Sequence, residues 1–145
     1  MADDAQSRLV IDIGGGSTEC IIGQRFEPQA MESLQMGCVS YGRAYFAGGR
    51  ISRGNYRKAY EQARAEIYRI RHRFNAKHWV ECVGSSGTLQ AIETILTQNK
   101  WEEGGISRAG LATLEKRLLK FKQMESIELD GLAAPRRNVI LPGVA

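Results

Sequence analysis

A glycine-rich turn between two apolar runs constrains this chain more than any other feature. Leu9–Ile11 is a short apolar run typical of a buried strand, and Cys20–Ile22 is another. The turn between them combines three glycines, two hydroxyl residues and an acid on each side: Asp12, Ile13, Gly14, Gly15, Gly16, Ser17, Thr18 and Glu19. Because a strand and not a helix follows the glycines, the spacing predicts a β-hairpin. It differs from the GxGxxG and GxxxxGK[ST] loops, which open into a helix.

The residue types of this hairpin suit a phosphate chain held beside a divalent cation. Glycines let backbone N–H groups approach phosphate oxygens closely, and Ser17 and Thr18 add hydroxyl donors. Asp12 and Glu19 supply the hard oxygen ligands that Mg²⁺ prefers. The alternative is a glycine-rich turn without a ligand, in which Asp12 caps the turn. Three glycines flanked by two acids are more than a turn needs, so we predict phosphate contacts from Gly14, Gly15, Gly16, Ser17 and Thr18.

A second glycine-rich segment lies between a predicted strand and a predicted helix. Trp79–Val83 has the apolar character of a strand, and Leu89–Leu96 suits a helix. The segment between them consists of Gly84, Ser85, Ser86, Gly87 and Thr88. A helix N-terminus after such a loop offers free N–H groups and a favourable dipole to an anion. Ser86 or Thr88 could instead simply cap the helix, but beside the hairpin motif we favour ligand contact for this segment.

The remaining pattern predicts an α/β domain. Met31–Met36 suits a third strand after a turn at Phe26–Gln29, and Asn138–Leu141 suits a last strand. A long helix ending at Asn75 is predicted by one apolar stripe with spacings of three and four: Tyr56, Tyr60, Ala63, Ile67, Ile70 and Phe74. The order βββαβα predicts a mixed sheet with helices packed against it, and 145 residues suit a single domain over residues 1–145.

Composition indicates a soluble globular protein. The chain is 43% hydrophobic and 25% charged, and it has neither a signal peptide nor an apolar run of membrane-spanning length. Its three cysteines, Cys20, Cys38 and Cys82, lack metal-site spacing. They are interpreted as reduced thiols, with Cys20 and Cys82 buried in strands. We therefore expect a cytoplasmic protein that does not contact the membrane.

The net charge of +4 arises largely from one segment. Residues 50–77 carry nine Lys or Arg residues against two acids, Glu61 and Glu66. This stripe suits a polyanion, or it is the solvated face of the long helix. No exposed aromatic residues are interleaved for base stacking, so nucleic acid is disfavoured as a partner.

Three segments resemble one family. The hairpin Asp12–Glu19 resembles the phosphate hairpin of the exopolyphosphatase and guanosine pentaphosphate phosphohydrolase family, within the actin-like, sugar-kinase and Hsp70 ATPase superfamily. Val83–Thr88 followed by Leu89–Ile92 is similar to the second glycine-rich loop of that family. Pro135–Gly143 is similar to its segment of an arginine, a strand and Pro-Gly. The resemblance implies a ribonuclease-H-like fold. It also implies that Arg136 occupies the family's arginine position and pairs with phosphate oxygens. The alternative is that Arg136 is a surface arginine beside a turn.

The resemblance also implies an activity. It is the hydrolysis of a phosphoanhydride: release of terminal phosphate from inorganic polyphosphate, or from guanosine pentaphosphate, a nucleotide of the stringent response. Mg²⁺ would be held by Asp12 and Glu19, and Glu19 would also orient the attacking water. We expect the full-length parent enzyme to be a homodimer. The alternatives are an ATP-binding sugar-kinase-like or chaperone-like domain and a non-catalytic phosphate or nucleotide sensor.

Enzymes of that family carry an earlier domain of the same fold and a catalytic glutamate upstream of the hairpin. Residues Met1–Arg8 contain no such motif. We therefore expect the chain to be the second actin-like domain of such an enzyme, truncated at both ends. Alone it should bind weakly and turn over little substrate.

Overall fold

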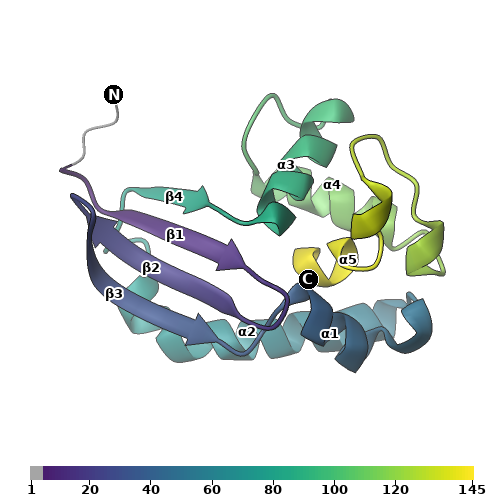
Figure 1. The fold of residues 1–145 in the computed structure, drawn as a ribbon, viewed down its shortest axis with the longest axis horizontal. Helices are drawn as coiled ribbons and strands as arrows, with labels where there is room; N and C mark the ends of the chain where they lie inside the picture. The colour runs from purple at the N-terminus through teal and green to yellow at the C-terminus, as the bar shows by residue number, and fades with distance from the viewer. Residues whose placement is uncertain (1–4) are drawn as a thin grey trace.

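Four strands form a mixed sheet in the order β3-β2-β1-β4 in the computed structural model, which describes residues 5–145 (Figure 1). The strands are β1 (Arg8–Ile13), β2 (Thr18–Gln24), β3 (Glu27–Leu34) and β4 (Glu81–Gly84). The first three are antiparallel neighbours, and β4 lies parallel to β1. The predicted α/β class with a mixed sheet is confirmed.

Helices surround this sheet unequally. They are α1 (Cys38–Tyr45), α2 (Arg53–Phe74), α3 (Gly87–Gln98), α4 (Arg108–Leu118) and α5 (Ile140–Val144). The long helix α2 runs along one face of the sheet, while α3, α4 and α5 gather beyond its end (Figure 1). Serines begin three of the helices, because Ser52, Ser86 and Ser107 each accept a hydrogen bond from a backbone N–H at the start of α2, α3 and α4. No helix among residues 5–145 combines the length and the apolar character needed to cross a membrane.

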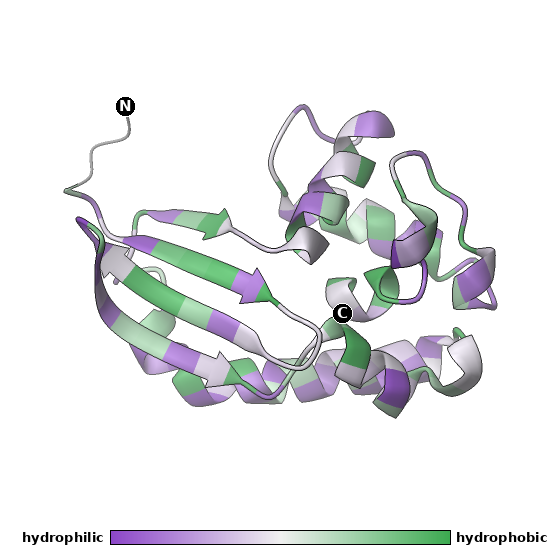
Figure 2. Cartoon of the chain, in the orientation of Figure 1, coloured by the Kyte–Doolittle hydropathy of each residue, from purple (hydrophilic) through white to green (hydrophobic). Residues whose placement is uncertain are grey.

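The buried side chains form two clusters. The smaller joins the inner face of the sheet to the end of α2 through Leu9, Cys20, Ile22, Leu34 and Phe74. The larger lies among the helices, and its most deeply buried members are Phe46, Ile92, Ile95, Leu96, Leu114, Leu118, Ile127, Ile140 and Leu141. Figure 2 shows apolar residues along β1 and β2, and alternating polar and apolar residues along α2.

The third strand begins four residues earlier than the predicted start at Met31. Arg25 and Phe26 have φ values of 52° and 65°, and they form the two-residue turn between β2 and β3. Such a turn normally carries Asn or Gly, so Arg-Phe gave no turn signal. Pro28 is tolerated in β3 because it lies on an edge strand beside a register shift.

The predicted last strand at Asn138–Leu141 is wrong. Ile140–Val144 is the short helix α5, and Ile140 and Leu141 are buried in the larger cluster. A four-residue apolar run fits a buried strand and a buried helical turn equally well, and its periodicity does not separate them.

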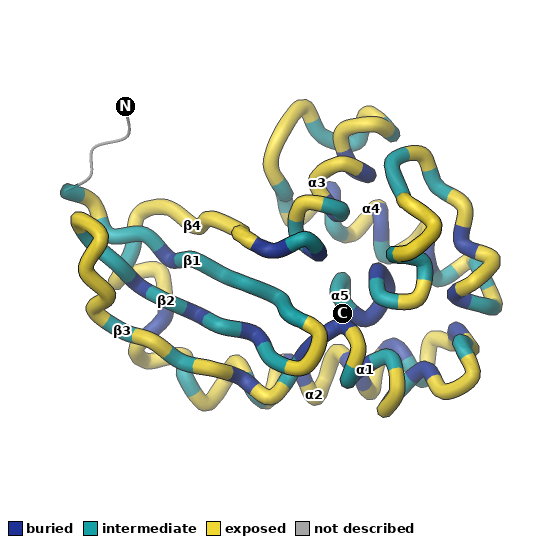
Figure 3. Tube along the Cα trace, viewed as in Figure 1, coloured by how far each residue is buried: buried dark blue, intermediate teal, exposed yellow. Residues whose placement is uncertain are grey.

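Two predictions of burial also fail. Cys82 is exposed, because β4 is a four-residue edge strand without a helix over it (Figure 3). The predicted end of α2 at Asn75 is confirmed. Tyr60 and Ile67 of its apolar stripe are nevertheless exposed, since each borders an open hollow and not a packed neighbour.

Candidate functional site

The two acids of the glycine-rich hairpin lie side by side on the sheet. Asp12 in β1 is the register partner of Glu19 in β2, and Glu19 is the partner of Ser33 in β3. Thr18 and Cys20 are buried toward α2, so the alternation of a strand puts Asp12 and Glu19 on the opposite, open face. A polar row of two carboxylates and a hydroxyl therefore crosses three strands beside the loop.

Glu19 is held in place by hydroxyl groups from two elements. Ser17 Oγ donates to Glu19 Oε1 at 2.7 Å, and Ser33 Oγ donates to the same oxygen at 2.8 Å. These two hydrogen bonds, that from Ser17 first, lower the pKa of Glu19 below its ordinary value. Glu19 is thus an oriented, ionised oxygen donor at neutral pH, and a poor proton acceptor.

In the loop from Gly14 to Ser17, three carbonyl groups accept hydrogen bonds and three amides are free. The Gly14 N–H donates to Ser17 O at 2.9 Å and closes the turn. The amides of Gly15, Gly16 and Ser17 make no hydrogen bond to any residue in the part of the chain that the structure describes. Gly15 and Gly16 are exposed. Consecutive free amides at a loop tip are a site for an anion.

Helix α1 fixes the inward side of this loop. Cys38 N–H donates to Gly14 O at 3.0 Å, and Val39 and Ser40 N–H groups both donate to Gly15 O at 2.9 Å. The residue before α1, Gly37, lies so close to the loop that a Cβ there would overlap the Gly15 carbonyl. Sequence reasoning missed Gly37, because only the fold brings it beneath the loop.

None of the loop glycines has a positive φ, so conformational freedom is not what selects them. A Cβ on Gly14 would lie 3.0 Å from Ser17 O, and one on Gly15 would lie 3.3 Å from Val39 Cγ2. A Cβ on Gly16 would meet nothing within 4 Å. Close backbone approach explains the first two glycines, while Gly16 keeps the outer surface of the loop open.

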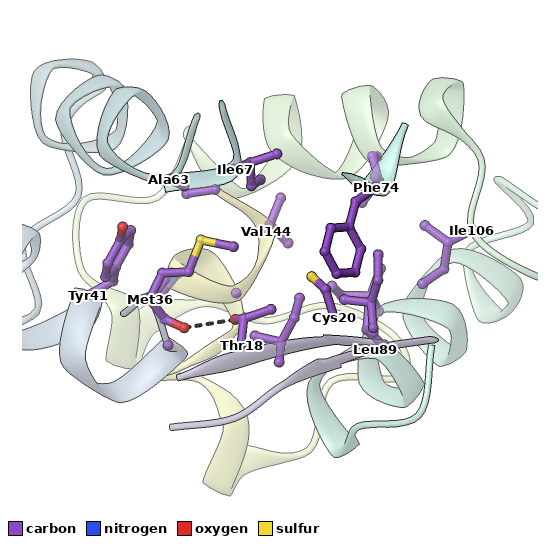
Figure 4. Close-up of a pocket in the computed structure, with 18 of the residues that line it drawn as sticks. Thr18, Cys20, Met36, Tyr41, Ala63, Ile67, Phe74, Leu89, Ile106 and Val144 are labelled. Atoms are coloured by element: carbon purple, nitrogen blue, oxygen red, sulfur yellow. Dashed lines mark hydrogen bonds between the residues drawn. The ribbon is translucent and has the colours of Figure 1, made fainter. Parts of the chain in front are cut away.

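Thr18 faces away from the loop's open side. It is buried, and its Oγ1 donates to Met36 O at 2.8 Å, which ties the hairpin to the turn before α1 (Figure 4). It borders a mostly apolar cavity of about 450 Å³ between the inner face of the sheet, α2 and α5. The hydroxyl predicted to contact phosphate therefore serves an internal contact, and the cavity that it borders has a mainly apolar lining.

The second glycine-rich loop reaches the same end of the sheet. Ser85 N–H donates to Ile11 O at 3.0 Å, so Ser85 follows β4 directly beside Asp12. Ser86 is buried, and its Oγ accepts from Leu89 N–H at 3.2 Å as the cap of α3. Thr88 is buried against Cys38, with 3.8 Å between Oγ1 and Sγ. The amides of Gly87 and Thr88 have no partner within residues 5–145.

Arg136 lies over the N-terminus of α3. A Cβ on Gly87 would overlap the Arg136 guanidinium. The absence of a side chain at Gly87 therefore leaves the space that the arginine occupies. Arg136 forms no ion pair with another described residue. An unpaired guanidinium above free helix N–H groups forms a second place with affinity for phosphate oxygens. The structure thus brings the second glycine-rich loop and Arg136 together, a contact that the sequence alone did not predict.

The donor set fits a magnesium ion of the kind that also binds substrate. Mg²⁺ is commonly held by one or two carboxylates together with phosphate oxygens and water. Asp12 and Glu19 are adjacent, and neither forms an ion pair within the described residues. A cluster of three or more potential protein ligands is absent from residues 5–145. A tightly held, all-protein metal site is therefore not the type that these residues form.

Comparisons with known proteins show which family and fold this chain resembles. The model of the Ppx/GppA phosphatase family matches residues 1–145. A guanosine-5'-triphosphate,3'-diphosphate pyrophosphatase of Aliivibrio fischeri is 38% identical over 138 residues, which are 95% of this chain and 28% of that relative.

Solved structures of similar fold carry related names. An exopolyphosphatase from Cytophaga hutchinsonii matches with a TM-score of 0.75 and 19% identity, covering 97% of this chain and 47% of that one. The Ppx/GppA family member from Aquifex aeolicus gives a TM-score of 0.76 and 20% identity, covering 96% and 46%. The chain therefore spans just over a quarter of that curated relative and just under half of each solved chain.

Proposed function

This chain belongs to the Ppx/GppA phosphatase family, and from that premise we propose that it is a phosphate-binding domain of a phosphoanhydride hydrolase. The substrates proposed are inorganic polyphosphate and guanosine pentaphosphate, which lose their terminal phosphate to water. The observation that carries the proposal is the row of free amides at Gly15, Gly16 and Ser17 beside the paired acids Asp12 and Glu19. Donors for phosphate and ligands for a cation meet there on one open surface.

Each part of the site has a separate role in this proposal. The loop amides hold phosphate oxygens, and Asp12 and Glu19 would hold Mg²⁺, which neutralises charge on the phosphates when bound. Arg136 and the N-terminus of α3 hold a second part of the substrate. Thr18 and Ser86 contribute through the backbone geometry that their side-chain hydrogen bonds fix.

Glu19 also orients the attacking water as a hydrogen-bond acceptor. Its lowered pKa makes Glu19 a weak base, so in this proposal another group removes the proton. We therefore propose that a glutamate outside this chain is the general base, and that the chain alone binds substrate with little turnover.

The test is Mg²⁺-dependent phosphate release by the complete protein that contains this chain. Long-chain polyphosphate, guanosine pentaphosphate and ATP are supplied in parallel. Release from either of the first two with ATP inert supports the proposal and ranks the substrates. Release from ATP alone indicates a kinase-like or chaperone-like domain, and binding without release indicates a sensor.

The metal assignment is tested in the same assay with Asp12→Asn and Glu19→Gln. Both changes keep the shape of the side chain and remove its charge, so we expect Mg²⁺-dependent release to be lost while the circular dichroism spectrum is unchanged. Glu128→Gln, an exposed acid remote in sequence from both loops, is the control. Near wild-type turnover in either hairpin variant would refute the assignment.

A further inference from the structure

A basic groove lies between α2 and α4, apart from the phosphate hairpin. Its volume is about 750 Å³, and it shares no lining residue with the apolar cavity behind the hairpin. The groove is lined by Arg53, Tyr56, Arg57, Tyr60, Glu115, Lys116, Leu119 and Lys120. The N-terminal half of α2 and the helix α4 both lie beyond the end of the sheet (Figure 1). This groove therefore belongs to the part of the fold that the hairpin site does not use.

The groove is lined by two cations from α2 and two from α4 and the turn after it. Arg53 and Arg57 are four residues apart and so share one face of α2. Lys116 in α4 and Lys120, which lies two residues after the end of α4, line the opposite side of the groove. No ion pair joins any of these four to another residue of the described part of the chain. Unpaired like charges on both sides of a groove are an arrangement that an anion with charge along its length would stabilise.

The acid that lines the groove is already engaged at its floor. Glu115 Oε2 accepts a hydrogen bond from the buried Tyr56 hydroxyl at 3.0 Å. This contact joins α2 to α4 beneath the cations and fixes the distance between the two walls. The surface offered to a ligand consequently carries an excess of positive charge.

We propose that this groove is a second anion site, which binds a linear polyphosphate chain at phosphates remote from those at the hairpin. The inference rests on the proposed function, because it takes polyphosphate as the substrate. An unbranched chain with a charge on every phosphate matches cations on both sides of the groove. Arginine binds phosphate oxygens in a planar fork, and lysine binds them as a point charge. Single-stranded nucleic acid would require several exposed aromatic side chains on which bases stack. Among the residues that line the groove, only Tyr60 is an exposed aromatic residue.

The test compares two double variants of the 145-residue chain. Arg57→Gln with Lys116→Gln removes one exposed cation from each wall. Arg64→Gln with Arg108→Gln removes one exposed cation from each of the same two helices, outside the groove. Affinities are measured for long-chain polyphosphate, for tripolyphosphate and for a single-stranded oligouridylate.

We expect the groove variant to bind long-chain polyphosphate about tenfold more weakly, with tripolyphosphate binding unchanged and the control variant close to the wild type. Equal losses in the two double variants would overturn the proposal, because the effect would then be one of net charge. Weaker oligouridylate binding with unchanged polyphosphate binding would overturn it in favour of nucleic acid. If tripolyphosphate does not bind the wild type, the proposal for the hairpin fails. The proposal for the groove is then tested separately by the affinities of the two double variants for long-chain polyphosphate.

Discussion

Gly37 supports the loop from below and makes no contact with a substrate in our proposal. Its missing side chain lets the Gly15 carbonyl approach the start of α1, where Val39 and Ser40 N–H groups receive it. This packing fixes the loop while its amides at Gly15, Gly16 and Ser17 have no partner among residues 5–145. At the scale of the single residue, the anion site thus depends on a glycine that lies more than twenty positions after the loop glycines it supports.

Gly37→Ala should therefore destabilise the chain and weaken phosphate binding together. The added Cβ overlaps backbone atoms that have no room to move, so we expect a loss of about 2 kcal/mol or more in the free energy of unfolding, measured by urea denaturation. The control is Gly16→Ala, where a Cβ meets no atom within 4 Å. Equal stability of the two variants would contradict the packing described here.

Ser33 sets the ionisation of Glu19 from the neighbouring strand. Ser33→Ala removes the second of the two hydroxyl donors to Glu19. The pKa of Glu19 should therefore rise toward its ordinary value. An NMR titration of the Glu19 side-chain carboxyl group measures this change. A lowered folded-state pKa stabilises the fold above the ordinary Glu pKa of about 4.3, and this contribution is lost as the pH falls through the lowered value. Thr113→Ala, which removes a hydroxyl bonded within α4, should leave the titration unchanged.

At the scale of elements, α3 and the segment before α5 form one unit. Gly87 at the start of α3 lies against Arg136, and Gly143 in α5 lies against Thr88. Both glycines permit close approach between segments that are about fifty residues apart. The helix N-terminus and the guanidinium consequently face the same point at the end of β4.

Arg136→Ala should weaken the binding of tripolyphosphate by the 145-residue chain about tenfold, because a charged donor beside the α3 amides is lost. Arg136→Lys should recover only part of the affinity, since lysine keeps the charge and lacks the planar fork. Isothermal titration calorimetry measures both, with the exposed Arg108→Ala as the control. An unchanged affinity in Arg136→Ala would contradict a role for Arg136 in phosphate binding and would favour the alternative of a surface arginine.

Sequence patterns predicted the elements with strong local signals and missed those that depend on tertiary contacts. The hairpin around Gly14–Gly16 and the helix ending at Asn75 followed from turn chemistry and a long apolar period. The start of β3 and the helix α5 did not, because an Arg-Phe turn and a four-residue apolar run carry no distinct signal. The glycine-rich motifs were visible locally, whereas the supporting Gly37 and the inward turn of Thr18 became visible only in the fold.

At the scale of the whole molecule, both glycine-rich loops converge because β1 and β4 are parallel. The carboxyl ends of parallel neighbours lie at the same edge of a sheet, so the loops after Ile13 and Gly84 meet beside Asp12. The apolar cavity and the basic groove lie elsewhere, on the other face of the sheet and between α2 and α4. The open edge of the sheet is thus the surface on which the proposed chemistry depends.

The most direct test of that claim is an NMR titration of the 145-residue chain with tripolyphosphate in the presence of Mg²⁺. We predict that the amide resonances of Gly15, Gly16 and Ser17 shift most, that Gly87 and Thr88 shift less, and that the exposed loop glycine Gly104 does not move. Saturable binding that leaves the three hairpin amides unmoved would contradict the account, because the phosphate would then lie away from the loop that defines the site.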